Sequence, residues 1–303
     1  PTIAVRYDSQ SSNGEMGLGW SLSAGSTVSR CSKNLEIDGV SSAYQFLADD
    51  VYCLDGQRLL GGPSSFRKMI DDQTQVNSMG ILEGGANHSG FSAFFPNGLI
   101  STYGTFDAKL NHPTNGKTAV FRVKKTQDRY GNTITYRYET NSTSGVQRLI
   151  GIDYSQYTVG FEYEGRGDIA EGFLSQGVKS RIDKRLNKIV VKLNNGQVLY
   201  SYQFTYQLPT QTQPYSLLDW MQYCNANNVC LKKTVFGWNY RPDFQTAAPL
   251  TGTLEPQAIT QHPLLGDFNG DGKTDALVRP MSGNNPGWTW RMYYGSAAGL
   301  SEI

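Results

Sequence analysis

Hydrophobic and polar residues alternate with a period of two along much of the chain, most clearly in Asp128–Tyr138. There Ile134, Tyr136 and Tyr138 alternate with Thr133, Thr135 and Arg137. A period of two places successive side chains on opposite faces of a β-strand. Gly131 precedes the run and accepts a positive φ, which favours a tight turn. The segment therefore predicts a half-buried strand that begins at a turn.

The same unit occurs twice more along the chain. Pro96-Asn97-Gly98 precedes Leu99–Tyr103, and Asn194-Asn195-Gly196 precedes Gln197–Tyr202. Each time a turn glycine is followed four or five residues later by a tyrosine (98→103, 131→136, 196→200). Tyrosine favours strands, so the unit is a structural building block. None of its residues is an obvious catalyst.

Further strand patterns cover residues 119–124, 133–138, 149–154, 159–163, 188–193, 198–206 and 234–240. Tyr44–Leu47 and Val51–Leu54 predict another strand pair around Asp49-Asp50. Leu217–Tyr223 instead indicates a helical turn or two. The chain is therefore expected to be all-β, with many short antiparallel strands.

Arg241–Gln261 lacks periodicity and contains Pro242, Pro249 and Pro256. This composition predicts a linker between a domain of residues 1–240 and a smaller one of residues 262–303. The opening Pro1–Tyr7 already has a strand pattern and no cleavable signal peptide precedes it, which favours a fragment or a mature form.

Composition narrows the function classes. The chain has 303 residues, 33 of them Gly and 18 Tyr, with 27 Lys and Arg against 26 Asp and Glu. A net charge near zero argues against a phosphate-tracking groove and hence against nucleic acid as a partner. No apolar stretch approaches the roughly 18 residues of a membrane span.

Gly14, Gly17 and Gly19 precede strand-like residues, whereas the glycines of a dinucleotide-binding site precede a helix. They therefore predict a turn that places Trp20 and Leu22 in a core, and not a dinucleotide site.

Four cysteines form two pairs that are close in sequence, Cys31/Cys53 and Cys224/Cys230. An even count in a loop-rich chain favours disulfides and an oxidising compartment. Buried free thiols and a zinc site are the alternatives. The absence of C-x-x-C spacing argues against zinc.

One stretch has a chemistry that can be named. Oxygen-bearing side chains stand at positions 1, 3, 5 and 9 of a loop, as Asp267, Asn269, Asp271 and Asp275, and Lys273 would add a backbone carbonyl at position 7. Ca²⁺ takes six to eight oxygen ligands, and Gly272 allows the sharp turn. Strand patterns flank the loop and Val278 replaces the EF-hand glutamate, so we expect a structural Ca²⁺ site between two strands.

Several of these stretches resemble one family. The opening Y-D-S-Q-S-S-N-G-E-M-G-L-G-W-S-L-S, the segment D-R-Y-G-N-T-I-T-Y-R-Y and the cysteine-bearing S-L-L-D-W-M-Q-Y-C-N-A-N-N-V-C-L-K-K-T-V-F-G-W are similar to the SpvB-type domain of Tc toxin B components and Rhs/YD-repeat proteins. Gly266–Val278 resembles the start of an FG-GAP/VCBS repeat, a calcium-binding blade of a β-propeller.

The resemblance implies a specific role. Residues 1–240 would form part of a β-shell and residues 262–303 the first elements of a propeller. The protein would be a non-catalytic segment of a secreted bacterial toxin that encloses and helps deliver a C-terminal toxic domain. Its partners would be the rest of the same polypeptide, that cargo, and a translocation component. The toxic activity itself would belong to other domains.

Other motifs support no sharper function. Arg166-Gly167-Asp168 spells an integrin-binding tripeptide, but a turn with a local ion pair is the simpler interpretation. His88, His112 and His262 lack partners at catalytic or ligand spacing and are expected on the surface or in turns. No acid, base and nucleophile can be assembled, so an enzyme is not expected. An extracellular adhesin that binds glycan or protein through aromatic strands and a calcium-tied propeller is the alternative.

Overall fold

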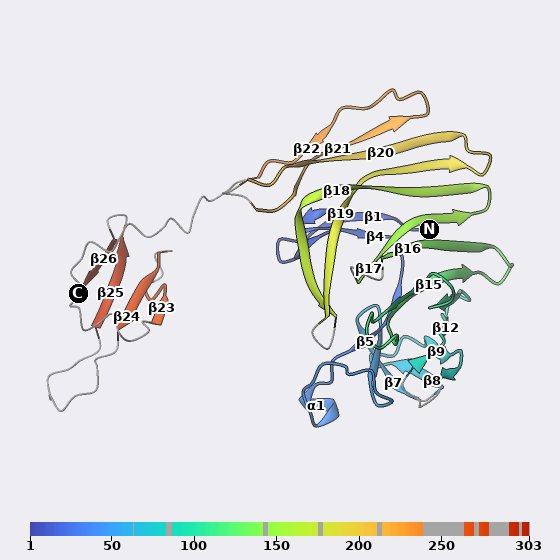
Figure 1. Ribbon diagram of the computed structural model, residues 1–303, viewed down its shortest axis with the longest axis horizontal. Coiled ribbons are helices and arrows are strands. Elements are labelled where there is room, and N and C mark those ends of the chain that lie inside the picture. The colour runs from blue at the N-terminus through green and yellow to red at the C-terminus, as the bar shows by residue number, and fades with distance from the viewer. Residues whose placement is uncertain are drawn as a thin grey trace. The chain divides into compact units, whose positions relative to one another are not determined.

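The computed structural model describes residues 1–62, 64–82, 87–141, 145–174, 178–210, 214–238, 264–269, 273–278, 291–296 and 299–302. The chain divides into two compact units, residues 1–237 and 238–303. Nearly all regular structure in both is β-strand (Figure 1), which confirms the all-β prediction. The predicted linker, 241–261, lies outside the described residues.

Eight strands of the first unit close into a small barrel. In order around the ring they are β5 (Thr27–Cys31), β6 (Val51–Leu54), β7 (Gln57–Gly61), β8 (Ser65–Lys68), β9 (Gln75–Ser78), β12 (Phe91–Phe94), β13 (Ile100–Tyr103) and β15 (Thr118–Gln127). All eight pairings are antiparallel, and the ring closes because β15 pairs with both β13 and β5.

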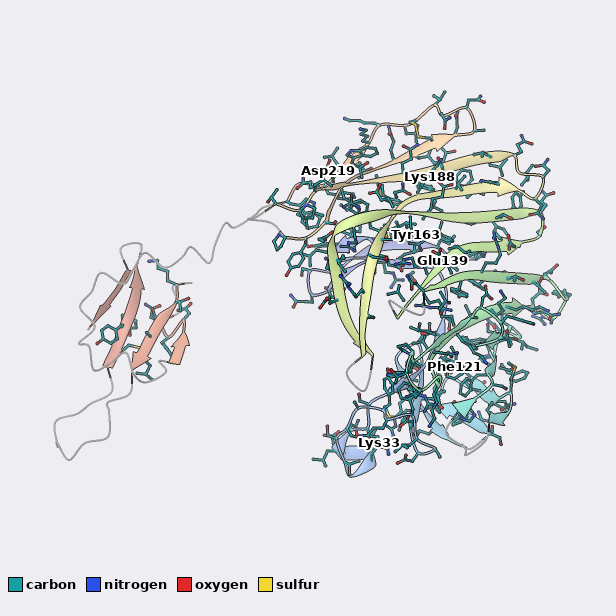
Figure 2. All side chains as sticks on the ribbon, viewed as in Figure 1. Lys33, Phe121, Glu139, Tyr163, Lys188 and Asp219 are labelled. Atoms are coloured by element: carbon teal, nitrogen blue, oxygen red, sulfur yellow. A yellow bond between two sulfur atoms is a disulfide. The ribbon has the colours of Figure 1, made fainter. Side chains whose placement is uncertain are left out.

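Aromatic side chains fill the interior of the barrel. Phe121 lies among the barrel strands (Figure 2). Its ring meets that of Phe91 edge to face with centroids 5.0 Å apart, and the ring centroid of Tyr52 lies 5.1 Å from that of Phe91. Phe91 and Phe121 have no exposed surface. An eight-stranded barrel has an interior just wide enough for side chains to fill, so this one is a packed core and not a channel.

Strand β15 also connects the barrel to a further row of longer strands in the same sheet. Val120–Arg122 pair with β5, whereas Lys125–Gln127 pair with β16. The sheet continues through β16 (Thr133–Asn141), β17 (Val146–Tyr154), β18 (Tyr157–Leu174), β19 (Val178–Leu193), β20 (Val198–Gln207), β21 (Leu217–Asn225) and β22 (Thr234–Val235). The β18–β19 hairpin is the longest, and its outer half bends away from the sheet (Figure 1).

The N-terminal segment packs against this sheet. Strand β1 (Ala4–Tyr7) pairs with β4 (Trp20–Ser23), and between them β2 (Asn13–Gly14) pairs with β3 (Gly17–Leu18). Val5, Trp20 and Leu22 contact the hydrophobic core, as predicted for Trp20 and Leu22. Short elements complete the unit: α1 (Leu35–Asp38), β10 (Ile81–Leu82), β11 (Asn87–His88) and β14 (Lys109–Asn111).

The repeated glycine-to-tyrosine unit is confirmed. Gly98, Gly131 and Gly196 have φ of 83°, 87° and 90°, the left-handed region that the turns require. The strands that follow bury Tyr103 and Tyr136, whose side chains belong to the core.

Three local predictions are wrong. Leu217–Tyr223 is not helical but part of β21, because pairing with β20 outweighs its local pattern. Tyr44–Leu47 is not a strand, since Phe46 has a positive φ of 60° and turns its ring against His112. The strand expected over residues 234–240 extends only over Thr234–Val235 within the described residues, and Phe236 instead packs on Trp20.

Both cysteine pairs form disulfides, as predicted. Cys31–Cys53 joins neighbouring barrel strands β5 and β6, and Cys224–Cys230 joins the end of β21 to the loop after it. No free cysteine is present, so thiol and zinc alternatives do not apply.

The second unit contains an antiparallel four-stranded sheet in chain order. Its strands are β23 (Leu264–Gly266), β24 (Asp275–Val278), β25 (Arg291–Ser296) and β26 (Gly299–Glu302). The predicted loop thus lies between two strands. Whether the sheet is a propeller blade stays a prediction.

Candidate functional site

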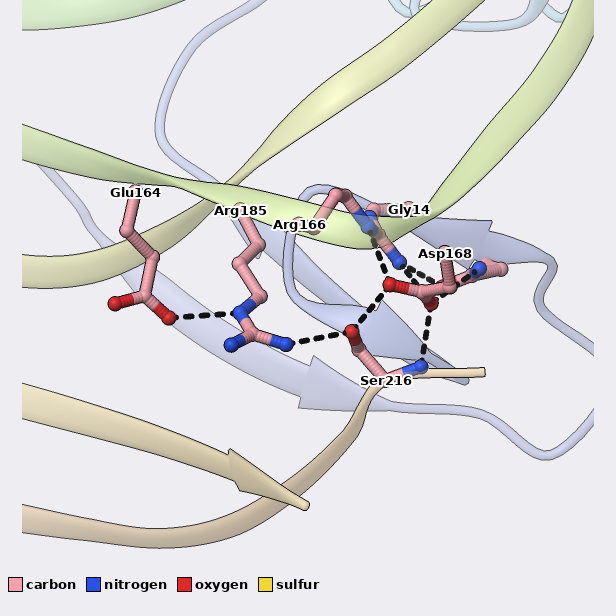
Figure 3. Close-up of polar contacts among 7 residues, drawn as sticks. Gly14, Glu164, Arg166, Asp168, Arg185 and Ser216 are labelled. Atoms are coloured by element: carbon pink, nitrogen blue, oxygen red, sulfur yellow. Dashed lines mark hydrogen bonds and ion pairs between the residues drawn. The ribbon is translucent and has the colours of Figure 1, made fainter. Parts of the chain in front are cut away.

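A buried polar cluster forms where the β18–β19 hairpin bends. It comprises Asn13, Glu164, Arg166, Asp168, Arg185 and Ser216 (Figure 3). The β18–β19 register shifts between Gly165 and Ala170, so Arg166-Gly167-Asp168 form a bulge. Residues two apart on a strand share a face, which aims Arg166 and Asp168 the same way.

Asp168 is the centre of the cluster. Arg166 donates two hydrogen bonds to its carboxylate, from Nε to Oδ1 (3.0 Å) and from Nη2 to Oδ2 (2.7 Å). Ser216 donates its backbone N–H and its hydroxyl, each at 2.5 Å, and Asn13 donates its amide at 3.1 Å. The side chains of Arg166 and Asp168 are 0% and 3% exposed. Five donors thus surround one buried carboxylate.

These contacts determine the ionisation of Asp168. Burial alone would raise its pKa, but the hydrogen bonds from Arg166, Ser216 and Asn13 outweigh burial and hold the pKa well below its usual value. Asp168 is therefore charged throughout the neutral and mildly acidic range.

The cluster joins three distant parts of the chain. Arg166 donates from Nη1 to the carbonyl of Gly14 (2.5 Å), and the N–H of Leu18 donates to the carbonyl of Ser216 (2.9 Å). At Gly17, a Cβ would lie 2.4 Å from the carbonyl oxygen of Ser216, so only glycine allows this approach. The N-terminal segment, the hairpin bend and the start of β21 are consequently held together.

Arg185 extends the cluster along β19. It donates from Nη1 to the Ser216 hydroxyl and from Nε to Glu164 Oε1, both at 2.7 Å, and its guanidinium lies 4.7 Å from the ring centroid of Tyr206. Ser216 is fully buried and its hydroxyl already bonds to Asp168 and Arg185. This serine is a structural connector and not an accessible nucleophile.

The integrin-like tripeptide is part of this cluster. The predicted ion pair between Arg166 and Asp168 is present, but it lies buried in a strand bulge rather than in an exposed turn. A partner cannot reach these side chains in the folded protein.

The prediction of a surface or turn position is wrong for His88, which lies buried in β11, whereas His112 does lie at a turn, where its carbonyl accepts the N–H of Gly116 (2.9 Å). His88 and His112 are 5% and 2% exposed, because His88 packs among Tyr52 and Phe91 and His112 packs against Phe46. Burial lowers the pKa of His88, and the positive charge of Arg30 lowers it further. His262 lies outside the described residues.

The predicted calcium loop is described in part. Asp275 is fully buried at the start of β24, and its carboxylate accepts the N–H of Phe268 (2.8 Å) and of Gly295 (2.7 Å). Asp267, Asn269 and Lys273 are exposed, and Asp271 lies outside the described residues. Among the described ranges no group of three or more His, Cys, Asp or Glu residues could hold a metal. Within the described part of the loop, Asp275 joins its two ends through the N–H of Phe268, and Asp267 and Asn269 lie at the surface.

Some tyrosine hydroxyls on strands β16–β20 bind backbone carbonyls. Tyr138 donates to the carbonyl of Val123 (2.7 Å) and Tyr163 to that of Leu149 (2.8 Å). Three other tyrosines, Tyr200, Tyr202 and Tyr223, form a partly exposed cluster, with 5.5 Å between the Tyr202 and Tyr223 ring centroids.

No family model and no curated protein matches the sequence. Solved structures do match the fold. The crystal structure of TcdB2-TccC3-Cdc42 superposes with a TM-score of 0.68 at 14% identity, over 97% of this chain and 17% of that one. The N-terminal domain of effector protein SpvB from Salmonella typhimurium strain LT2 gives 0.57 at 14% identity, over 78% of this chain and 94% of that one.

The chain has the Tc/SpvB-type fold. The Photorhabdus luminescens Tc holotoxin pore also matches it, with a TM-score of 0.65 at 13% identity over 97% of this chain. The chain spans 17% of the length of that Tc chain. The resemblance to the SpvB-type domain is confirmed at the level of the fold, whereas the resemblance to an FG-GAP/VCBS repeat stays a prediction.

No helix in the described ranges has the length and hydropathy needed to cross a membrane.

The buried polar cluster had one signal in the sequence: a charged pair two residues apart on a strand pattern. Its partners Asn13 and Ser216 had none, because nothing local relates them to Arg166.

Proposed function

We propose that residues 1–237 are a wall segment of a secreted toxin shell, a non-catalytic scaffold that encloses a toxic cargo carried by the same polypeptide. The proposal rests on the fold match to Tc toxin structures. The match covers almost all of this chain and a minor part of theirs. The two disulfides support an oxidising, extracellular location.

The geometry is compatible with a wall. The sheet extends from the barrel to β22 without a break, and the buried polar cluster fixes the N-terminal segment across it. The remaining polypeptide would continue this wall, and a translocation component would receive the cargo. The groups of the cluster are committed to each other, which favours a mechanical role over a catalytic one.

Limited proteolysis of the full-length product of the gene tests the proposal. Trypsin should spare the C-terminal cargo in the intact protein and digest the same cargo segment made alone under conditions that keep it unfolded. If the cargo is cleaved at the same rate in both, these residues do not enclose it.

We also propose that Ca²⁺ binds the loop through Asp267, Asn269, Asp271, Asp275 and the carbonyl of Lys273. Each carboxylate oxygen of Asp275 accepts one backbone N–H and retains a lone pair, so the residue can hold the loop closed and still face a cation. The bound ion would neutralise the loop carboxylates and tie the loop, a structural role.

Calorimetric titration of the full chain with Ca²⁺ tests this site. We expect saturable one-site binding that Asp271→Ala abolishes and that Asp219→Ala, in the other unit, leaves unchanged. Equal heats for the parent chain and Asp271→Ala would contradict the assignment.

An adhesin is the second candidate, and the tyrosine cluster favours it. Tyr202 is 40% exposed beside Tyr200 and Tyr223, and aromatic faces of this kind are used for binding. A glycan array on the full chain should then give a specific sugar signal that Tyr202→Ala removes. No signal on the array would leave the shell as the function.

A further inference from the structure

A cavity of about 560 Å³ lies within the first unit, between the N-terminal segment and the long strands. Its walls come from the segment between β2 and β5, from β15, β16 and β17, and from β19. Pockets for small molecules measure about 300–1,000 Å³ and combine apolar walls with a few polar groups. Leu22, Val146 and Ile182 are among the apolar residues that line this one, so it has the size and the walls of a ligand site.

Glu15 is the acidic group of the cavity wall. Its side chain is 28% exposed, and its carboxylate accepts no hydrogen bond from any described residue. Arg148 places Nε 3.9 Å from Glu15 Oε1, which exceeds hydrogen-bonding distance, and donates from Nη2 to Asp183 instead. Burial raises the pKa of Glu15, because its charged form is poorly compensated by the protein. The carboxylate of Glu15 therefore presents unused acceptors to the cavity.

Arg122 is the basic group of the same wall. Its guanidinium lies over the ring of Tyr138, another lining residue, with 5.9 Å between Cζ and the ring centroid. Nε donates to the Gln147 side chain (2.9 Å), and Nη2 donates to the Gln147 carbonyl (3.3 Å). Nη1 is not buried and donates to none of the residues that the structure describes. Two hydrogen bonds thus hold Arg122 in place and leave both N–H groups of Nη1 unused.

The two opposite charges lie close together but do not pair. Glu15 and Arg122 form no ion pair among the described residues. The charge of Arg122 nevertheless lowers the pKa of Glu15 more than that of Arg148 does, whose Nε is 3.9 Å away. A buried charge is costly unless it is paired and hydrogen-bonded. A ligand with one ammonium and one carboxylate would pair both groups and add no net charge, whereas a singly charged ligand would pair only one of them.

We propose that this cavity binds an apolar α-amino acid in its zwitterionic form. The ammonium group donates to the carboxylate of Glu15, and the ligand carboxylate accepts from Nη1 of Arg122. Hydrogen bonds between charged groups are about twice as strong as those between neutral groups. An α-amino acid carries both charges on one carbon, which suits two protein charges that lie close together. The apolar wall contacts the ligand side chain. The site is separate from the tyrosine cluster and does not depend on the proposed shell function.

Calorimetric titration of the full chain at neutral pH tests the site directly. The zwitterionic probes are leucine, methionine and phenylalanine. Each is compared with its amide, which keeps only the ammonium charge, and with its N-acetyl derivative, which keeps only the carboxylate charge. We expect at least one zwitterion to bind with a dissociation constant of about 1 mM or tighter, and its two derivatives to bind at least about tenfold more weakly.

Two variants assign each end of the ligand to its residue. Glu15→Gln keeps the shape of the side chain and removes its charge, so it should weaken zwitterion binding about tenfold and abolish the preference over the N-acetyl derivative. Arg122→Met should instead abolish the preference over the amide.

The matched controls are Glu171→Gln and Arg181→Met. These two side chains also lie 3.9 Å apart, but they are 44% and 55% exposed and do not line the cavity. Each control should change binding less than about twofold. Circular dichroism checks the folding of each variant, and if Arg122→Met does not fold, Glu15→Gln and the three forms of each probe decide the question.

Three results would overturn the proposal. The first is the absence of saturable heat with every zwitterionic probe. The second is a singly charged derivative that binds as tightly as its zwitterion, which would indicate a site for a cation at Glu15 or for an anion at Arg122 alone. The third is an unchanged preference for the zwitterion in Glu15→Gln, which would place the binding elsewhere on the protein.

Discussion

Replacing Asp168 with alanine should destabilise the first unit strongly. The change removes five hydrogen-bond acceptor contacts and leaves the guanidinium of Arg166, which is 0% exposed, without its counter-ion. Breaking a buried ion pair from one side costs about 3–5 kcal/mol. With an urea m-value of about 3 kcal/mol/M, the unfolding midpoint should fall by about 1 M or more.

Urea denaturation of the full chain at neutral pH, followed by tryptophan fluorescence, measures this loss. Hydrogen exchange adds a local measurement, since amide protection should fall first at Leu18 and Ser216, which the cluster holds together. Arg181→Ala is the matched control, because its ion pair with Glu171 lies on the same hairpin but is 55% and 44% exposed. Such a pair is worth about 0–1 kcal/mol.

Two further measurements separate the charge from the packing. The double variant Arg166→Met/Asp168→Leu should recover much of the loss, because an apolar pair leaves no buried charge uncompensated. The pKa of Asp168 is lowered in the fold, so its stabilisation is fully present above its unfolded pKa of about 3.9 and is lost as pH falls below that value. The difference in free energy of unfolding between the parent chain and Asp168→Ala should therefore become smaller below about pH 4. A cost for Asp168→Ala no greater than that of Arg181→Ala would refute the reasoning.

Three other changes test separate parts of the structure. Burial raises the pKa of Glu15, so its charged form lowers the stability of the fold at neutral pH. In thermal melts, Glu15→Gln should therefore raise the melting temperature at pH 7 and change it little below about pH 4. The same gain at both pH values would contradict this. Gly17→Ala adds a clash at Ser216 to the strain of a positive φ of 81°, so it should lower the melting temperature more than Gly196→Ala, where φ is 90° and the space is open. Removing Cys31–Cys53, which closes a loop with a sequence separation of 22, should lower the free energy of unfolding by about 3 kcal/mol. Removing Cys224–Cys230, with a separation of 6, should lower it by about 2 kcal/mol. Urea denaturation of the two paired serine variants measures both losses, and equal losses would exclude a loop-entropy origin.

The sequence alone determined the class of fold and its repeated unit. Alternation with a period of two is a local property, so the strands that contain Tyr103 and Tyr136 could be predicted from their own residues. Glycine is the residue that reaches positive φ without cost, so Gly98, Gly131 and Gly196 marked their turns. The even cysteine count predicted disulfides, and the order of motifs indicated the fold that the Tc and SpvB structures share.

The tertiary structure decided what depends on contacts between distant residues. Leu217–Tyr223 is a strand because it pairs with β20. His88 is buried because it packs against Tyr52, a residue of the barrel. The buried polar cluster joins Asn13 to Asp168 and Ser216, which lie 155 and 203 positions further along the chain. Local periodicity carries no information about such pairs, because burial and pairing arise only when the folded sheet brings the segments together. The role of Asp168 could therefore be read only from the structure.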